Sequence, residues 1–183
     1  MVAFEQVKQI LLPNELWQEI VTHCRRKLEG KYFEGESPVR RAYGLVAGSQ
    51  NRHGLRVERV VPIKKNVRDQ EPYKTYMNGV MEQHAVPSKT PISRRGWITD
   101  PVELKESYAR LDQERMVVFG TYHMHVVPWK NDPLRECPTH LDTILGRDSH
   151  LFSFIVSMVD IAHPKIRAFF EGAADKETPI LIQ

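Results

Sequence analysis

Two histidines one residue apart, His123 and His125, directly follow an apolar run of the chain. Side chains two residues apart in a β-strand point to the same face, so the sequence predicts two imidazoles side by side at a strand end. Two histidine nitrogens and a carboxylate oxygen, with a fourth position open to water, are the usual ligands of a catalytic zinc ion. Asp142, which follows in the next polar segment, is the expected third ligand.

The same residues also have a purely structural interpretation. Two histidines at a strand end can simply hydrogen-bond to the backbone. Thr139-x-x-Asp142 matches a capping box, in which the acid lies at the positive end of the helix dipole. Because capping and metal binding are compatible, the residues alone leave both interpretations open.

We do not expect the other potential metal ligands near this pattern to bind the ion. Cys137 and His140 flank Thr139 and carry atoms that zinc accepts, but we interpret them as a loop residue and an exposed residue at a helix start. The zinc deaminase signature needs a Glu after the first histidine and a pair of cysteines, and neither is present. The remaining histidines have no partner at metal-ligand spacing: His23, His53, His84, His150 and His163.

The elements that must position these side chains follow from apolar periodicity and turn residues. Helices are predicted over 14–30, over 76–84, over 101–111 with a capping box from Asp100 to Glu103, and from 139 onward. Strands are predicted over 42–48, 55–62, 116–122, 151–161 and 166–170, with Pro164 in the last turn and a hairpin turn at 51–54.

Length and composition limit the class of protein. A chain of 183 residues with 41% hydrophobic residues fits one domain of ordinary globular type. A net charge of +3 is too small to indicate a nucleic-acid partner. Two cysteines, no signal peptide and no long apolar span predict a soluble protein of the cytoplasm, without a membrane partner. The expected fold is α/β (α+β), a single domain over 1–183 with a central mixed β-sheet flanked by helices.

Taken in order along the chain, these residues resemble the JAMM/MPN metallopeptidases, also called the JAB1/MPN or Mov34 family. That family draws its zinc site from H-x-H-P followed by S-x-x-D, with a general-base Glu upstream. The resemblance implies a JAB1/MPN-like (cytidine-deaminase-like) fold and a Zn²⁺ ion held by His123, His125 and Asp142. It covers most of the chain, through the segments 42–48, 60–66, 73–82, 103–111, 119–125, 151–156 and 166–168.

The chain departs from the family pattern around the ligands. Asp142 lies 142 − 125 = 17 residues after the second histidine, which implies a loop insertion around 126–138, and a second irregular insertion is expected around 85–99. Pro128 is displaced from its place directly after the histidine. Thr139 stands where the family has Ser, and its hydroxyl could take the role that the resemblance assigns there, which is to help hold the oxyanion.

The most serious departure concerns the general base. The family's Glu position, three residues before Gly44, holds Arg41, which cannot accept a proton. Glu36 is the replacement that we assign, although Glu34, Asp132 and Glu136 are alternatives. General acid–base assistance is typically worth about 10²- to 10⁴-fold in rate, so an enzyme without a base would be slower by about that factor.

Three functional hypotheses follow. The resemblance implies a zinc-dependent metallopeptidase or isopeptidase that hydrolyses an amide bond at the tail of a ubiquitin-like or sulfur-carrier-like protein. Arg41 favours a second, a catalytically impaired MPN-type scaffold or protein-interaction module with a retained or vestigial metal site. The third is a ligand-binding α/β domain whose histidines are structural.

Overall fold

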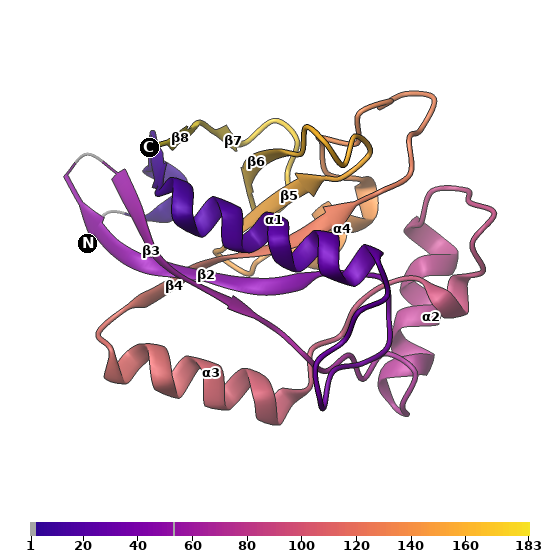
Figure 1. Cartoon of the computed structure of the whole chain (residues 1–183). Helices are drawn as coiled ribbons and strands as arrows, with labels where there is room; N and C mark the ends of the chain where they lie inside the picture. The colour runs from indigo at the N-terminus through magenta and orange to yellow at the C-terminus, as the bar shows by residue number, and fades with distance from the viewer. Residues whose placement is uncertain (1–2, 53) are drawn as a thin grey trace.

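One mixed β-sheet organises the chain, with strand order β7-β6-β5-β4-β2-β3-β1-β8 (Figure 1). The computed structural model describes residues 3–52 and 54–183, so the prediction for His53 lies outside the described residues. The strands are β1 (Ile10–Leu12), β2 (Tyr43–Asn51), β3 (Gly54–Pro62), β4 (Val117–His125), β5 (Phe152–Ser157), β6 (Lys165–Phe170), β7 (Glu177–Thr178) and β8 (Ile180–Ile182). The helices are α1 (Asn14–Leu28), α2 (Tyr73–His84), α3 (Pro101–Gln113) and α4 (His140–Gly146), with 3-10 turns at Phe4–Gln6 and Ile92–Arg94.

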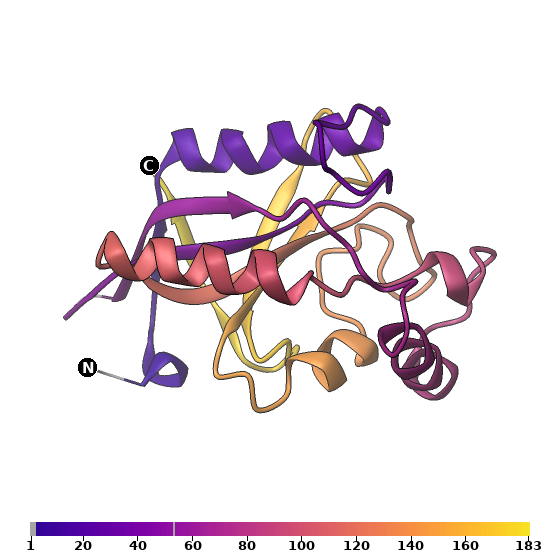
Figure 2. The same ribbon diagram turned by 90° about the horizontal axis from the view of Figure 1, so that it is seen from below.

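Helices α1 and α3 cover opposite faces of the sheet (Figure 2). Helix α1 buries its apolar stripe, including Trp17, Ile20 and Cys24, in the larger core, to which β4 contributes Phe119 and Tyr122. Helix α3 packs through Leu111 and Leu104 on a smaller core over β2, β3 and β4. Helices α2 and α4 contact each other at one end of the sheet, near the end of β4.

The sheet curls until it is nearly closed. Strands β7 and β8 are the two edges of the sheet, yet only Pro179 separates them in sequence. The carbonyl of Pro179 accepts a hydrogen bond from the Ile10 amide at 2.9 Å, and β1 pairs with both β3 and β8 in parallel. A single residue therefore connects the two edges of the sheet.

The structure confirms the mixed α/β class and most predicted elements, with local corrections. The strand predicted over 151–161 ends at Ser157, because residues 158–164 form a turn. Strands β1, β7 and β8 had no counterpart in the prediction. Asp100 does cap α3, but the predicted reciprocal bond from Glu103 is absent: Glu103 instead accepts from the Lys64 and Lys65 amides, both at 2.8 Å.

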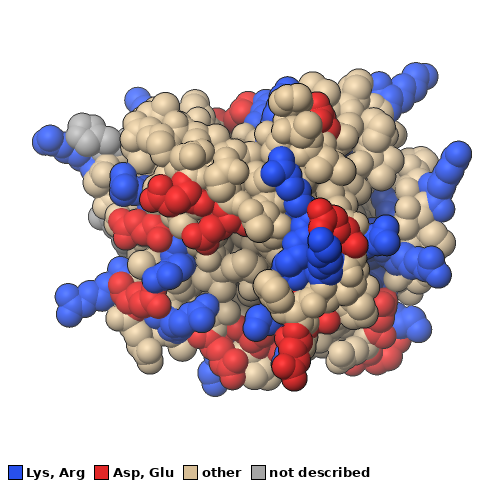
Figure 3. Space-filling view, viewed as in Figure 1, with Lys and Arg blue, Asp and Glu red and all other residues tan. Residues whose placement is uncertain are grey.

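The surface mixes both signs of charge over the face shown in Figure 3, as a net charge of +3 leads one to expect. Within residues 3–52 and 54–183, no helix is both long enough and apolar enough to cross a bilayer.

Candidate metal site

The two histidines end the strand that lies at the middle of the sheet. In β4, His123 pairs with Tyr43 of the antiparallel strand β2 and with Ile155 of the parallel strand β5. Their neighbours Tyr122 and Met124 point into the core under α1, so the histidines point to the opposite face. His125 is 7% exposed, and β5 holds its backbone, because His125 pairs with Ser157 and its carbonyl accepts from the Met158 amide at 2.8 Å.

Helix α4 brings Asp142 to the histidines. The helix begins with the predicted capping box, in which Thr139 Oγ1 accepts from the Asp142 amide and Asp142 Oδ2 accepts from the Thr139 amide at 2.6 Å. The Thr143 hydroxyl anchors the first turn by donating to the Gly172 carbonyl at 2.7 Å. Gly172 has φ +64°, and a Cβ there would lie 2.7 Å from the Asp142 carbonyl oxygen, so this close approach requires glycine.

The distances among the three side chains fit a metal ion. The two Nε2 atoms are 3.2 Å apart, His123 Nε2 lies 3.3 Å from Asp142 Oδ1, and His125 Nε2 lies 3.5 Å from Asp142 Oδ2. Ligand bonds of about 2.0 to 2.2 Å in a tetrahedron separate the donor atoms by roughly 3.3 to 3.6 Å. Within the described part of the chain, His123, His125 and Asp142 are the one cluster of three such donors that could share an ion.

The electrostatics within these three residues, here called the metal triad, favour an ionised Asp142 and a neutral His125. Burial opposes ionisation of Asp142, but the charge of His123 and hydrogen bonds from both histidines hold its pKa well below the usual range. Burial is the main cause that lowers the pKa of His125, against the opposing effect of Asp142. Carboxylate and neutral imidazole are the forms that bind a cation.

Hydrogen bonds from Thr139 hold the Asp142 side chain in place, whereas no described residue supports His125 through its Nδ1 atom. Asp142 Oδ2 accepts two hydrogen bonds from Thr139, from its amide and from its hydroxyl at 2.7 Å, which leaves Oδ1 as the freer ligand atom. His125 Nδ1 is buried, and no described residue bonds to it, whereas metal-bound histidines usually donate from the second ring nitrogen. The ligand positions therefore fit a metal ion, while the support of the second histidine comes from packing.

Thr139 is at the site, but its hydroxyl has another partner. The single hydroxyl proton is donated to Asp142 Oδ2. Because a hydroxyl has one proton to donate, Thr139 cannot hold Asp142 and an oxyanion at the same time. In this geometry Thr139 orients the Asp142 carboxylate, and its role in holding an oxyanion stays a prediction.

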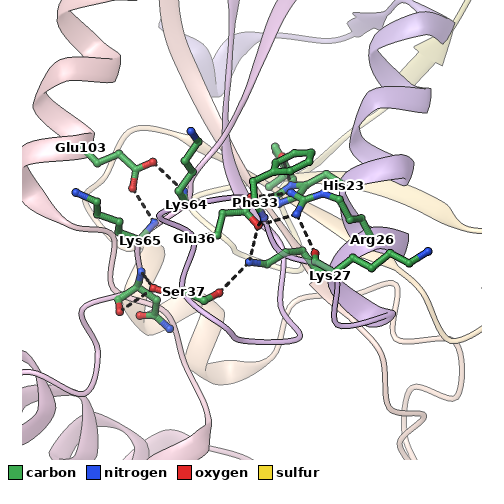
Figure 4. A network of polar contacts seen from close by, with 12 residues as sticks. His23, Arg26, Lys27, Phe33, Glu36, Ser37, Lys64, Lys65 and Glu103 are labelled. Carbon is green, nitrogen blue, oxygen red and sulfur yellow. Dashed lines mark hydrogen bonds and ion pairs between the residues drawn. The ribbon is translucent and has the colours of Figure 1, made fainter.

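Glu36 is not brought to the metal triad. Its carboxylate lies in the network of Figure 4, where Arg26 Nη1 and Nη2 donate to it at 2.6 and 2.7 Å and Lys27 Nζ lies 3.6 Å away. Burial opposes its ionisation, but the bonds from Arg26 and the Phe33 amide and the charge of Lys27 lower its pKa to about 2. A carboxylate held so firmly ionised and paired is a poor proton acceptor, so the geometry does not support Glu36 as the base.

The alternative carboxylates are also elsewhere. Asp132 accepts from the Glu136 and Cys137 amides and so closes the 132–137 turn, and Glu136 pairs with Lys165 at 2.7 Å. Cys137 Sγ accepts from Arg167 at 3.1 Å, and the His140 ring packs against His84, so neither joins the metal triad. None of the four candidate bases, Glu34 included, lines the cleft described next.

The metal triad opens into a cleft of about 1080 Å³. Its walls come from the end of β4, from α4, from α2 and from the two segments that the sequence marked as insertions, 85–99 and 126–138. Arg41 lines this cleft. It lies two residues before β2 begins at Tyr43, the residue that pairs with His123.

Sequence reasoning missed two other cleft residues, Arg95 and Arg135. Both lie in irregular segments, where no periodicity indicates the direction of a side chain. Their only signal in the sequence was that each belongs to a long connection, and such connections often carry function.

No protein-family model and no curated protein matches this sequence. Among solved structures, the chain is similar to the solution structure of protein DSY2949 from Desulfitobacterium hafniense. The likeness has a TM-score of 0.61 and 20% sequence identity, and it covers 95% of this chain and 92% of that chain. At this level of identity the comparison shows a shared fold.

Proposed function

We propose that this protein is a zinc-dependent hydrolase of the JAMM/MPN type, with a JAB1/MPN-like fold, that cleaves an amide bond. The observation that carries the proposal is the convergence of His123, His125 and Asp142 at zinc-ligand spacing, inside a cleft large enough for a substrate. The substrate class, an amide at the tail of a ubiquitin-like or sulfur-carrier-like protein, rests on the sequence resemblance alone.

Each residue has a defined part in this proposal. Zinc would supply a Lewis acid for the scissile carbonyl and lower the pKa of water. His123 and Asp142 line the cleft and would serve as ligands, and Thr139 fixes the orientation of the Asp142 carboxylate. Helix α2 and the 85–99 segment form the wall that would exclude bulk water.

One observation favours a second candidate, an MPN-type scaffold with a metal site of reduced or no activity. Among the described residues that line the cleft, Asp142 is the one acidic side chain, and Arg41 lies where a base is needed. Without a carboxylate near the metal triad, proton transfer has no protein acceptor, and the rate would fall by about 10²- to 10⁴-fold.

The cytoplasmic setting also remains part of the proposal. Cys24 is buried and free, and burial raises the pKa of its thiol to about 12. Cys137 is free as well and contacts Arg167. Two unpaired thiols are typical of a reducing compartment.

The test is metal content and turnover in matched variants. Purified protein loaded with zinc at neutral pH should hold about one ion per chain by elemental analysis, and His123→Ala and Asp142→Asn should lose it. His163→Ala is the control, because that exposed histidine pairs with Asp160 in the turn after β5 and does not line the cleft. Absence of bound metal in the wild type would refute both candidates.

Turnover then separates the two candidates. A ubiquitin-like protein carrying a peptide amide at its tail is the substrate. Zinc-dependent cleavage that His123→Ala abolishes and His163→Ala preserves supports the hydrolase. Stoichiometric zinc with no cleavage supports the scaffold.

A further inference from the structure

The cleft beside the metal triad is basic. Five basic side chains line it, against the single carboxylate of Asp142. Arg40 and Lys89 are exposed, whereas Arg41, Arg95 and Arg135 are half-buried. Half-buried charges are screened less by solvent, so these three arginines dominate the electrostatics of the cleft.

No carboxylate within the described residues neutralises these three guanidinium groups. Arg41 donates to the Arg94 carbonyl at 2.8 Å, which leaves its charge uncompensated. The Arg95 side chain makes no hydrogen bond or ion pair with any described residue. Arg135 Nε is buried and has no bonding partner in the part of the chain that the structure describes. Buried donors without acceptors are unfavourable and are rarely kept without a reason.

The charges of the three arginines act on one another. Burial and the charge of Arg95 lower the pKa of Arg41, and burial and the charge of Arg135 lower that of Arg95. Arg41, Arg95 and Arg135 therefore repel one another within the cleft that they share with the metal triad.

Hydrogen bonds hold the segments that carry Arg95 and Arg135 in place. Arg68, which is only 2% exposed, donates Nε to the Arg95 carbonyl at 2.7 Å and Nη2 to the Ile92 carbonyl at 2.9 Å. These bonds fix the segment that presents Arg95. The Leu134 carbonyl accepts a hydrogen bond from the Ser157 hydroxyl, which ties the segment that presents Arg135 to the end of β5.

The remaining wall of the cleft is apolar and open to ligand. Tyr76, Val127 and Leu145 line it with exposed fractions of 58%, 61% and 40%. Binding clefts commonly combine such an apolar wall with a few polar groups that set the orientation of the ligand. Guanidinium groups match the geometry of carboxylate and phosphate oxygens, which they bind through two parallel hydrogen bonds.

We propose that the cleft binds its ligand through an oxyanion group, a carboxylate or a phosphate, that Arg95 and Arg135 hold beside the metal triad. This inference deepens the proposed function, on which it rests for the chemistry of the adjacent bond: the substrate is an amide that carries an anionic group and an apolar body. A peptide C-terminus or an N-acyl amino acid has this chemistry when the group is a carboxylate.

The test measures binding without metal, so that it is independent of the proposed activity. Chelator-treated protein is titrated calorimetrically with N-acetylphenylalanine, with its neutral amide and with inorganic phosphate. We expect the acid to bind at least 10-fold more tightly than the amide. Arg95→Gln and Arg135→Gln should each weaken that binding at least 10-fold, and raising the salt from 20 to 300 mM should weaken it further.

Arg94→Gln is the matched control, because it removes the same charge one residue away from an exposed side chain that does not line the cleft. It should leave binding unchanged. Tighter binding of phosphate than of the acid would identify a phosphorylated ligand, and the reverse would identify a carboxylate.

Equal binding of acid and amide, or no binding of either anion, would overturn the proposal. So would equal losses in Arg94→Gln and Arg95→Gln. If Arg95→Gln does not fold, Arg135→Gln decides alone. Metal-free anion binding in a protein that fails to take up zinc would refute the proposed function and leave the oxyanion site standing.

Discussion

The ion pair of Glu36 gives the sharpest quantitative prediction. Its side chain is 1% exposed, and its pKa of about 2 lies below the ordinary value of 4.5. The difference of 2.5 units, at about 1.36 kcal/mol per unit, corresponds to about 3 kcal/mol of folding free energy. We therefore expect Glu36→Gln to lower the free energy of unfolding by about 3 kcal/mol at pH 7.

The pH dependence has a definite sign. The unfolded chain takes up a proton at Glu36 near pH 4.5, whereas the folded chain does so only near pH 2. This contribution is complete above about pH 5 and is lost as the pH falls toward 2. The difference in unfolding free energy between wild type and variant should be constant from pH 7 to 5 and shrink below pH 4.5.

Urea unfolding followed by circular dichroism, at a series of pH values, measures this difference. Glu34→Gln is the control, because Glu34 is exposed and its loss should change the unfolding free energy by less than about 0.5 kcal/mol. If Glu36→Gln were no less stable than Glu34→Gln and abolished hydrolysis, Glu36 would be a base, and the structural interpretation would be refuted.

Two further predictions concern the metal site. Arg41→Glu should raise amide hydrolysis by about 10²- to 10⁴-fold, because position 41 lines the cleft of the metal triad and would gain a proton acceptor; an unchanged rate at saturating zinc would show that a carboxylate at 41 does not reach the reaction. Thr139→Val should weaken zinc binding by about 10- to 100-fold in competition with a chelating dye and cost about 1 kcal/mol of stability, since it removes the hydroxyl bonded to Asp142. Thr139→Ser should retain both, and equal losses in the two variants would refute the role of the hydroxyl.

The metal triad could be predicted from sequence because its signals are local. The alternation of β4 fixes the shared face of His123 and His125, and the capping box fixes the start of α4 and the place of Asp142. What could not be predicted is pairing over long distances. Strand β1 has three residues and is defined only by its neighbours β3 and β8, so no periodicity is available to reveal it.

Contacts between distant parts of the chain also explain why Glu36, which we assigned as the base, lies away from the histidines. Glu36 was close in number to Arg41, but its partners, Arg26 and Lys27, belong to the last turn of α1 and lie on the other side of the sheet from the histidines. Glu103 illustrates the same limit, since a residue with the right spacing for a local cap bonds instead to two amides beyond the end of β3. Sequence spacing identifies side chains that could act locally, and the tertiary fold decides which ones do.

Pro179 connects the two edge strands β7 and β8, and this link should affect the rigidity of the strand that carries the histidines. A border strand that is free can fray, and fraying spreads inward to its neighbours. Because β7 and β8 are joined through one residue, neither edge strand can separate from the sheet without disturbing the other. We expect the middle strand, which carries both imidazoles, to keep its shape before any ion arrives, and amide hydrogen exchange should be slowest along it.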